Sequence, residues 1–249
     1  MKKRLLLLGL KFVWGLALVT VIAWYSDMGE SWTAIRTARP APLVLATLLG
    51  VLSVFLAAVG VTLVGRAVSD ELGWLEGIKG FCLAWVLGFF LGRVSELSLP
   101  VFWRRHLPVS QGAAVVLVDK LVSVTWVTVL GSVGLGLLVD PRVGLLAGGL
   151  GVAGLGGVLF VMLSDSARRV AGKLLPDRWV DTLRDLPDTF RLVTQRRRSA
   201  VVANVIITGL RAVLHGVILV VLMAALGQTL SPIIGIAIQA MITLTSVSY

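Results

Sequence analysis

The chain has 249 residues, of which 57% are hydrophobic and 14% charged, and its mean hydropathy is +0.94. This composition excludes an ordinary water-soluble domain and indicates a polytopic membrane protein. Its apolar runs reach the roughly 18 residues that a spanning helix needs and lack strand-like alternation. We therefore expect an all-α bundle of about six spanning helices that fills residues 1–249 as a single membrane domain.

The net charge of +10 does not indicate nucleic acid, because the basic residues stand at the ends of the apolar runs, where topology and anionic lipids place them. The only cysteine, Cys82, and the two histidines have no metal-ligand spacing. The sequence contains no catalytic Ser/His/Asp set or carboxylate pair. We predict neither an enzyme nor a cofactor or metal site.

The first apolar run, residues 5–25, follows the basic residues Lys2, Lys3 and Arg4. It is too long for a signal peptide and lacks a cleavage pattern, so it predicts a retained helix with a cytoplasmic N-terminus in the cell inner membrane. Residues 27–42 are either a short surface helix or a solvated loop. A second helix over residues 43–65 returns the chain to the cytoplasm.

The apolar run over residues 77–92 is short for a full crossing and is followed by Arg104 and Arg105. A full crossing would place this pair and the basic loop 164–199 outside, against the positive-inside rule. We therefore predict a re-entrant hairpin over residues 77–107, with both ends in the cytoplasm.

Arg93 and Glu96 lie in this hairpin three residues apart, so they share a face of any helical turn. Ionisable groups at membrane depth are expensive and mark functional sites. The pair is predicted to contact a lipid head group, with Glu96 pairing with Arg93 in the empty state. The alternative is a structural salt bridge that holds the hairpin.

Two further helices are predicted over residues 112–139 and 143–163, and the short turn between them makes them antiparallel neighbours. The first carries Asp119 and Lys120. The second is rich in glycine, which is typical of a packing seam in lipid. The loop 164–199 has an amphipathic pattern and is predicted to lie on the cytoplasmic leaflet, either to recruit anionic lipid or to orient the bundle.

A helix over residues 200–226 carries Asn204, Thr208, Arg211 and His215 at offsets that put all four in one stripe. Arg211 falls near the helix centre, where an unpaired guanidinium costs at least about 2.5 to 3.5 kcal/mol. The stripe should therefore face the protein interior or a wet cavity. The last apolar run, residues 231–249, has no cytoplasmic flank, so we expect the sequence to be C-terminally incomplete.

Three segments carry a family resemblance: GRVSE (92–96), WRR (103–105) and AVVLVDKL (114–121). They resemble the G-R-x-G-E, basic-cluster and E-R-x-x-D motifs of the lysylphosphatidylglycerol synthase transmembrane, flippase-like family. Ser95 replaces a glycine, Asp119 and Lys120 replace Glu-Arg, and Ser123 replaces an aspartate. The family's G-G-x-G-x-R-E segment would follow Tyr249.

The resemblance implies lipid handling without the soluble aminoacyl-transferase domain, and an inverted-repeat architecture with broken helices. We predict a translocase or binder of an anionic lipid or lipid-linked phosphate. The alternative is a non-transporting membrane scaffold for a glycosyltransferase or lipid-modifying enzyme, held through residues 164–199. The predicted head-group residues are Arg93, Glu96, Arg104, Arg105, Asp119, Lys120 and Arg211, supported by a polar stripe of Asn204, Thr208 and His215.

Overall fold

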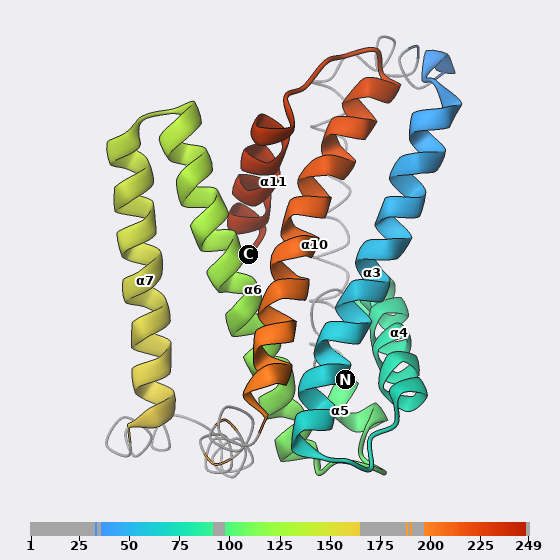
Figure 1. Cartoon of the computed structure of the whole chain (residues 1–249), viewed down its shortest axis with the longest axis vertical. Helices are drawn as coiled ribbons and strands as arrows, with labels where there is room; N and C mark the ends of the chain where they lie inside the picture. Colours follow the sequence, from blue (N-terminus) through green and yellow to red (C-terminus); the bar gives the residue numbers. More distant parts are fainter. Residues whose placement is uncertain are drawn as a thin grey trace, which may run out of the picture.

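A computed structural model describes residues 36–91, 98–164 and 197–247, together with residues 33, 188 and 190. Every regular element in these ranges is a helix, which confirms the all-α class (Figure 1). The predicted first helix, most of the loop 164–199 and the turn with Arg93 and Glu96 lie outside the described residues. The helices are α3 (Pro40–Val68), α4 (Trp74–Leu91), α5 (Leu99–Phe102), α6 (Val109–Leu138), α7 (Pro141–Leu163), α10 (Arg198–Ala225) and α11 (Pro232–Val247).

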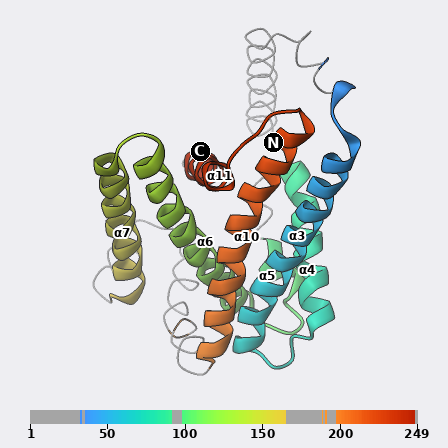
Figure 2. The same ribbon diagram turned by 45° about the horizontal axis from the view of Figure 1, so that its top comes forward.

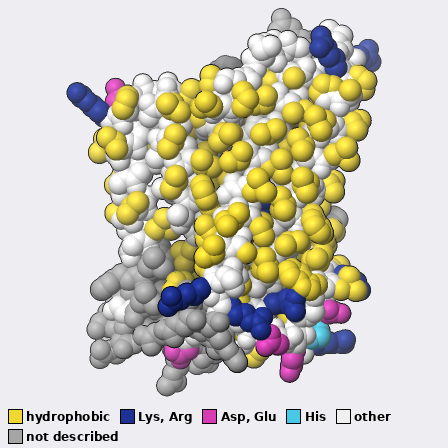
Figure 3. Space-filling view, viewed as in Figure 1, with side chains coloured by type: hydrophobic (Ala, Val, Ile, Leu, Met, Phe, Trp, Pro, Cys, Tyr) yellow, Lys and Arg dark blue, Asp and Glu magenta, His cyan; other side chains and the backbone are white. Residues whose placement is uncertain are grey.

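Three of the described helices, α3, α6 and α10, are long and apolar enough to cross a membrane. They have 29, 30 and 28 residues, so at about 1.5 Å per residue each exceeds the roughly 30 Å hydrocarbon core. The visible surface is apolar over its middle, and charged side chains gather toward its two ends (Figure 3). These features establish a multi-pass membrane protein.

The helix boundaries follow from local backbone chemistry. Proline opens α3, α7 and α11, where its missing N–H has no helical partner to lose. The Asp140 carboxylate accepts a hydrogen bond of 2.7 Å from the Arg142 backbone N–H and caps α7. After α10, Gly227 takes the left-handed conformation at φ 77°, which suits glycine at a helix C-terminus. Helix α5 was not predicted from the sequence, and the described boundaries of the other helices lie within three residues of the predicted apolar runs.

Helices α3 and α10 lie side by side and antiparallel along their whole lengths (Figures 1 and 2). At one end the Arg39 N–H donates to the Ala225 carbonyl at 2.9 Å. Near the other end Gly60 faces Asn204, and a Cβ on this glycine would come within 3.1 Å of the amide nitrogen. The glycine therefore brings the two helices together where Asn204 is buried.

Helix α11 packs between α6 and α10 with glycines at both contacts. A Cβ on Gly134 of α6 would lie 2.8 Å from the Ala237 side chain, and a Cβ on Gly216 of α10 would lie 2.4 Å from Ile236 Cα. Helix α6 in turn holds α10 through the Trp126 indole, whose N–H donates to the Val205 carbonyl at 2.8 Å. Helices α6, α10 and α11 thus form one closely packed part of the bundle, and they line a cavity between them.

The glycine-rich helix α7 packs against α6 through only part of its predicted seam. Gly144, Gly148 and Gly151 face Ser132, Gly136 and Thr128 of α6. The other predicted seam glycines, 149, 154, 156 and 157, have no described neighbour within 4 Å of an added Cβ. The glycine contacts between α7 and α6 therefore lie on one side of α7 only, among the described residues.

An apolar core of buried residues that includes Trp103 lies at the end of the bundle where α10 begins. This side chain is 1% exposed and follows the short helix α5. It lies against Gly65 of α3 and Gly80 of α4, where an added Cβ would come within 3.1 and 2.5 Å of the ring. The Trp103 indole therefore packs the segment after α5 against both α3 and α4.

Candidate functional site

A cavity of about 420 Å³ lies between α6, α10 and α11. Its volume falls in the range of about 300 to 1,000 Å³ that is typical of small-molecule sites. Apolar side chains form much of the wall, and polar groups enter from all three helices. The lining residues are Lys120, Ser123, Val124, Trp126, Val127, Leu130, Thr208, Arg211, Ala212, His215, Gln239, Ala240 and Thr243.

Two basic side chains, Lys120 and Arg211, line the cavity from neighbouring helices. Lys120 lies about 16 Å along α6 from Val109, and Arg211 lies about 20 Å along α10 from Arg198, at a rise of 1.5 Å per residue. Both positions are close to the middle of their helices. Among the described residues that line the cavity there is no aspartate or glutamate, so the formal charge of this part of the wall is positive.

The predicted polar stripe of α10 faces the interior, as its periodicity requires. Asn204 and Thr208 are 0% and 5% exposed, and Thr208, Arg211 and His215 all line the cavity. The Thr208 hydroxyl is buried and has no hydrogen-bond partner among the described residues. A hydroxyl in this state is suited to donate to an acceptor that enters the cavity.

His215 is held from the opposite side by α3. Its Nε2 and the Ser53 hydroxyl share a hydrogen bond of 2.7 Å, and Ser53 is itself 3% exposed. Sequence reasoning missed Ser53, because a lone serine in an apolar run carries no periodic signal. It also missed Gln239 and Thr243 of α11, which are separated by one helical turn and line the third wall.

Asp119 is buried beside this cavity and does not line it. Its carboxylate accepts a hydrogen bond of 3.0 Å from the Asn204 side-chain amide. This contact joins α6 to α10 next to the close approach of Gly60. The structure therefore pairs the acidic residue of one predicted motif with the polar stripe of another helix.

An Asn204→Leu variant is expected to lower the free energy of unfolding by about 1 to 3 kcal/mol, because the buried Asp119 carboxylate loses a donor. Chemical unfolding in mild detergent measures the change. The Asn204→Asp variant should be worse still, since it places a second carboxylate against the first. An unchanged stability in both variants would contradict the role of this contact.

Arg104 and Arg105 lie away from the cavity, just after α5. Both are exposed, at the end of the bundle where α10 begins. The structure therefore brings together Lys120, Thr208, Arg211 and His215, and it pairs Asp119 with Asn204. It leaves the two arginines as a separate basic surface.

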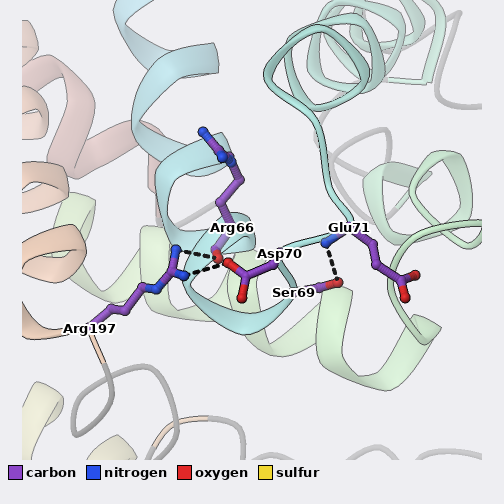
Figure 4. A network of polar contacts seen from close by, with 5 residues as sticks. All are labelled: Arg66, Ser69, Asp70, Glu71 and Arg197. Atoms are coloured by element: carbon purple, nitrogen blue, oxygen red, sulfur yellow. Dashed lines mark hydrogen bonds and ion pairs between the residues drawn. The ribbon is translucent and has the colours of Figure 1, made fainter.

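A polar cluster at this same end joins α10 to the loop after α3 (Figure 4). Arg197 forms an ion pair with Asp70 and donates to the Arg66 carbonyl at 3.3 Å. The Ser69 hydroxyl accepts from the Glu71 N–H at 3.3 Å and donates to the His106 carbonyl. The side chains of the ion pair are 44% and 73% exposed, so it orients the helix ends and contributes little stability.

The Arg66 guanidinium lies over the Trp74 ring, 4.9 Å from its centroid. The stacking is a cation–π contact between the last turn of α3 and the first residue of α4. It therefore fixes the turn that directs α4 back along the bundle.

One comparison with known proteins identifies a family of membrane regions. The chain matches the family model described as "Lysylphosphatidylglycerol synthase TM region" over residues 12–248. Neither a curated protein nor a solved structure matches the chain. Because the match covers nearly every residue, the chain belongs to the family of lysylphosphatidylglycerol synthase transmembrane regions.

Proposed function

We propose that this chain binds an anionic lipid or a lipid-linked phosphate in the cavity between α6, α10 and α11, and moves its head group across the membrane. The observation that carries the proposal is the pair of basic side chains, Lys120 and Arg211, in a cavity without described acidic lining residues. Family membership supports a lipid-related function.

The electrostatics of the cavity favour a phosphate group. A guanidinium presents a planar fork of donors that matches two phosphate oxygens, and a lysine adds a compact positive charge. Such interactions are stronger in a site of low dielectric than in water. The Thr208 hydroxyl and the Gln239 amide add neutral donors on two of the walls.

The basic surface of Arg104 and Arg105 would attract anionic head groups to the end of the bundle where α10 begins. We place this end in the cytoplasm of the cell, which follows the positive-inside rule. Residues 77–107 would form a re-entrant hairpin there, with Arg93 and Glu96 at its turn. In this arrangement the exposed arginines collect the lipid and the cavity receives its head group.

A Lys120→Gln variant is expected to weaken binding of phosphatidylglycerol by about tenfold or more, because it removes a charge-assisted hydrogen bond worth about 1.5 to 3 kcal/mol. The affinity is measured by native mass spectrometry of the full chain in detergent, to which phosphatidylglycerol is added at increasing concentrations. The matched control is Lys79→Gln, at an exposed lysine of α4. Equal affinities for both variants and the wild type would refute the proposed site and favour the non-transporting scaffold.

A further inference from the structure

A second, smaller cavity of about 160 Å³ lies between α10 and α11. The described residues that line it are Ile218, Leu219, Leu222, His215 and Gln239. Three of these five side chains are aliphatic, and no charged side chain is among them. The described part of the wall therefore offers no lysine or arginine to an anionic head group, and its aliphatic side suits a hydrocarbon chain.

The two cavities share His215 and Gln239. These side chains, from α10 and α11, stand between the larger cavity with its cations and the smaller aliphatic one. His215 is held in this position by its hydrogen bond of 2.7 Å to Ser53. His215 and Gln239 therefore mark the boundary between the larger cavity, which has basic side chains, and the smaller cavity, which is mostly aliphatic.

We propose that the smaller cavity holds an acyl chain of the same lipid whose head group occupies the larger one. This inference rests on the proposed function, and it narrows the ligand to an anionic amphiphile with a hydrocarbon chain rather than a free phosphate. The acyl chain of the lipid moves into the cavity from the lipid bilayer and not from water. Its contribution to binding is therefore selectivity through van der Waals packing.

The arrangement also orients the lipid. Leu222 follows Arg211 by eleven residues, which places it about 16 Å further toward the Ala225 end of α10. The head group therefore lies on the Arg198 side of its chain. A lipid in the leaflet at the Arg198 end of α10 has this same orientation of head group and acyl chains. We therefore infer that the ligand comes from this leaflet.

The experiment compares two probes on the full chain by native mass spectrometry. One probe is dioleoyl phosphatidylglycerol, and the other is glycerophosphoglycerol, which has the same head group without chains. A Leu219→Trp variant fills the smaller cavity and should weaken binding of the dioleoyl lipid by about tenfold, with the affinity for glycerophosphoglycerol unchanged. The matched control, Leu210→Trp, adds the same ring at a position of α10 that is 55% exposed and should change neither affinity.

The inference is overturned if Leu219→Trp leaves both affinities unchanged or weakens both equally. The Lys120→Gln variant separates this failure from failure of the proposed function, since loss of the head-group site must weaken both probes. If Leu219→Trp does not fold, the Leu222→Trp variant decides by the same comparison, because Leu222 is 38% exposed and tolerates a larger ring.

Discussion

An Arg211→Gln variant is expected to move anionic lipid about 30-fold more slowly than the wild type, a change of about 2 kcal/mol. Arg211 lines the cavity near the middle of α10. In the proposed function, its charge replaces water around the head group as the lipid crosses. Glutamine keeps donors of similar reach and removes the charge. The loss therefore reports electrostatic stabilisation of the head group at mid-membrane.

Proteoliposomes with fluorescent phosphatidylglycerol, quenched from outside by dithionite, measure this rate for the full chain. An Arg211→Lys variant should fall between the two, because it keeps the charge and loses the planar fork. Arg142→Gln is the matched control, since Arg142 is exposed at the start of α7. Lipid movement at the wild-type rate in Arg211→Gln would remove Arg211 from the pathway.

The second large effect is expected from Gly216→Val, which should destabilise the protein by about 3 kcal/mol. A Cβ at this position would lie 2.4 Å from Ile236 Cα and 2.7 Å from Ile236 N. These are backbone atoms of α11, so a rotamer change cannot relieve the clash and the helix must move. Because α11 forms one wall of the cavity, binding of phosphatidylglycerol should weaken as well.

Gly149→Val in α7 is the control for this change. It introduces the same β-branched side chain into a helix interior, with the same cost in helix propensity, and no described atom lies within 4 Å of its added Cβ. Chemical unfolding in detergent compares the two variants. A similar loss of stability in both would show that propensity, and not the contact between α10 and α11, explains the result.

The positions of the helices could be predicted from the sequence because they depend on local properties. Long apolar runs must satisfy their own backbone groups in lipid, and proline or glycine marks several of their ends. The stripe of Asn204, Thr208 and His215 around Arg211 was also local information, since helical periodicity alone put these residues on one face. The cost of a charge in lipid then required that this face point inward.

The partners of these residues could not be predicted in the same way. Nothing in the local pattern links Ser53 to His215, which is 162 positions away, or Asp119 to Asn204, which is 85 positions away. The sequence also could not separate the predicted head-group residues into those that line the cavity and those that do not. Only the packing of the helices placed Lys120 in the cavity, Asp119 beside it, and Arg104 at an exposed end of the bundle.

The sequence by itself determined that this is an all-helical membrane protein with an inward-facing polar stripe around Arg211. Only the tertiary structure decided which helices complete the cavity. Helix α11 supplies a wall because Gly216 and Gly235 let it approach α10 closely, and Gly134 does the same on α6. The physical reason is that helix formation depends on neighbours along the chain, whereas a cavity depends on close contacts between distant segments.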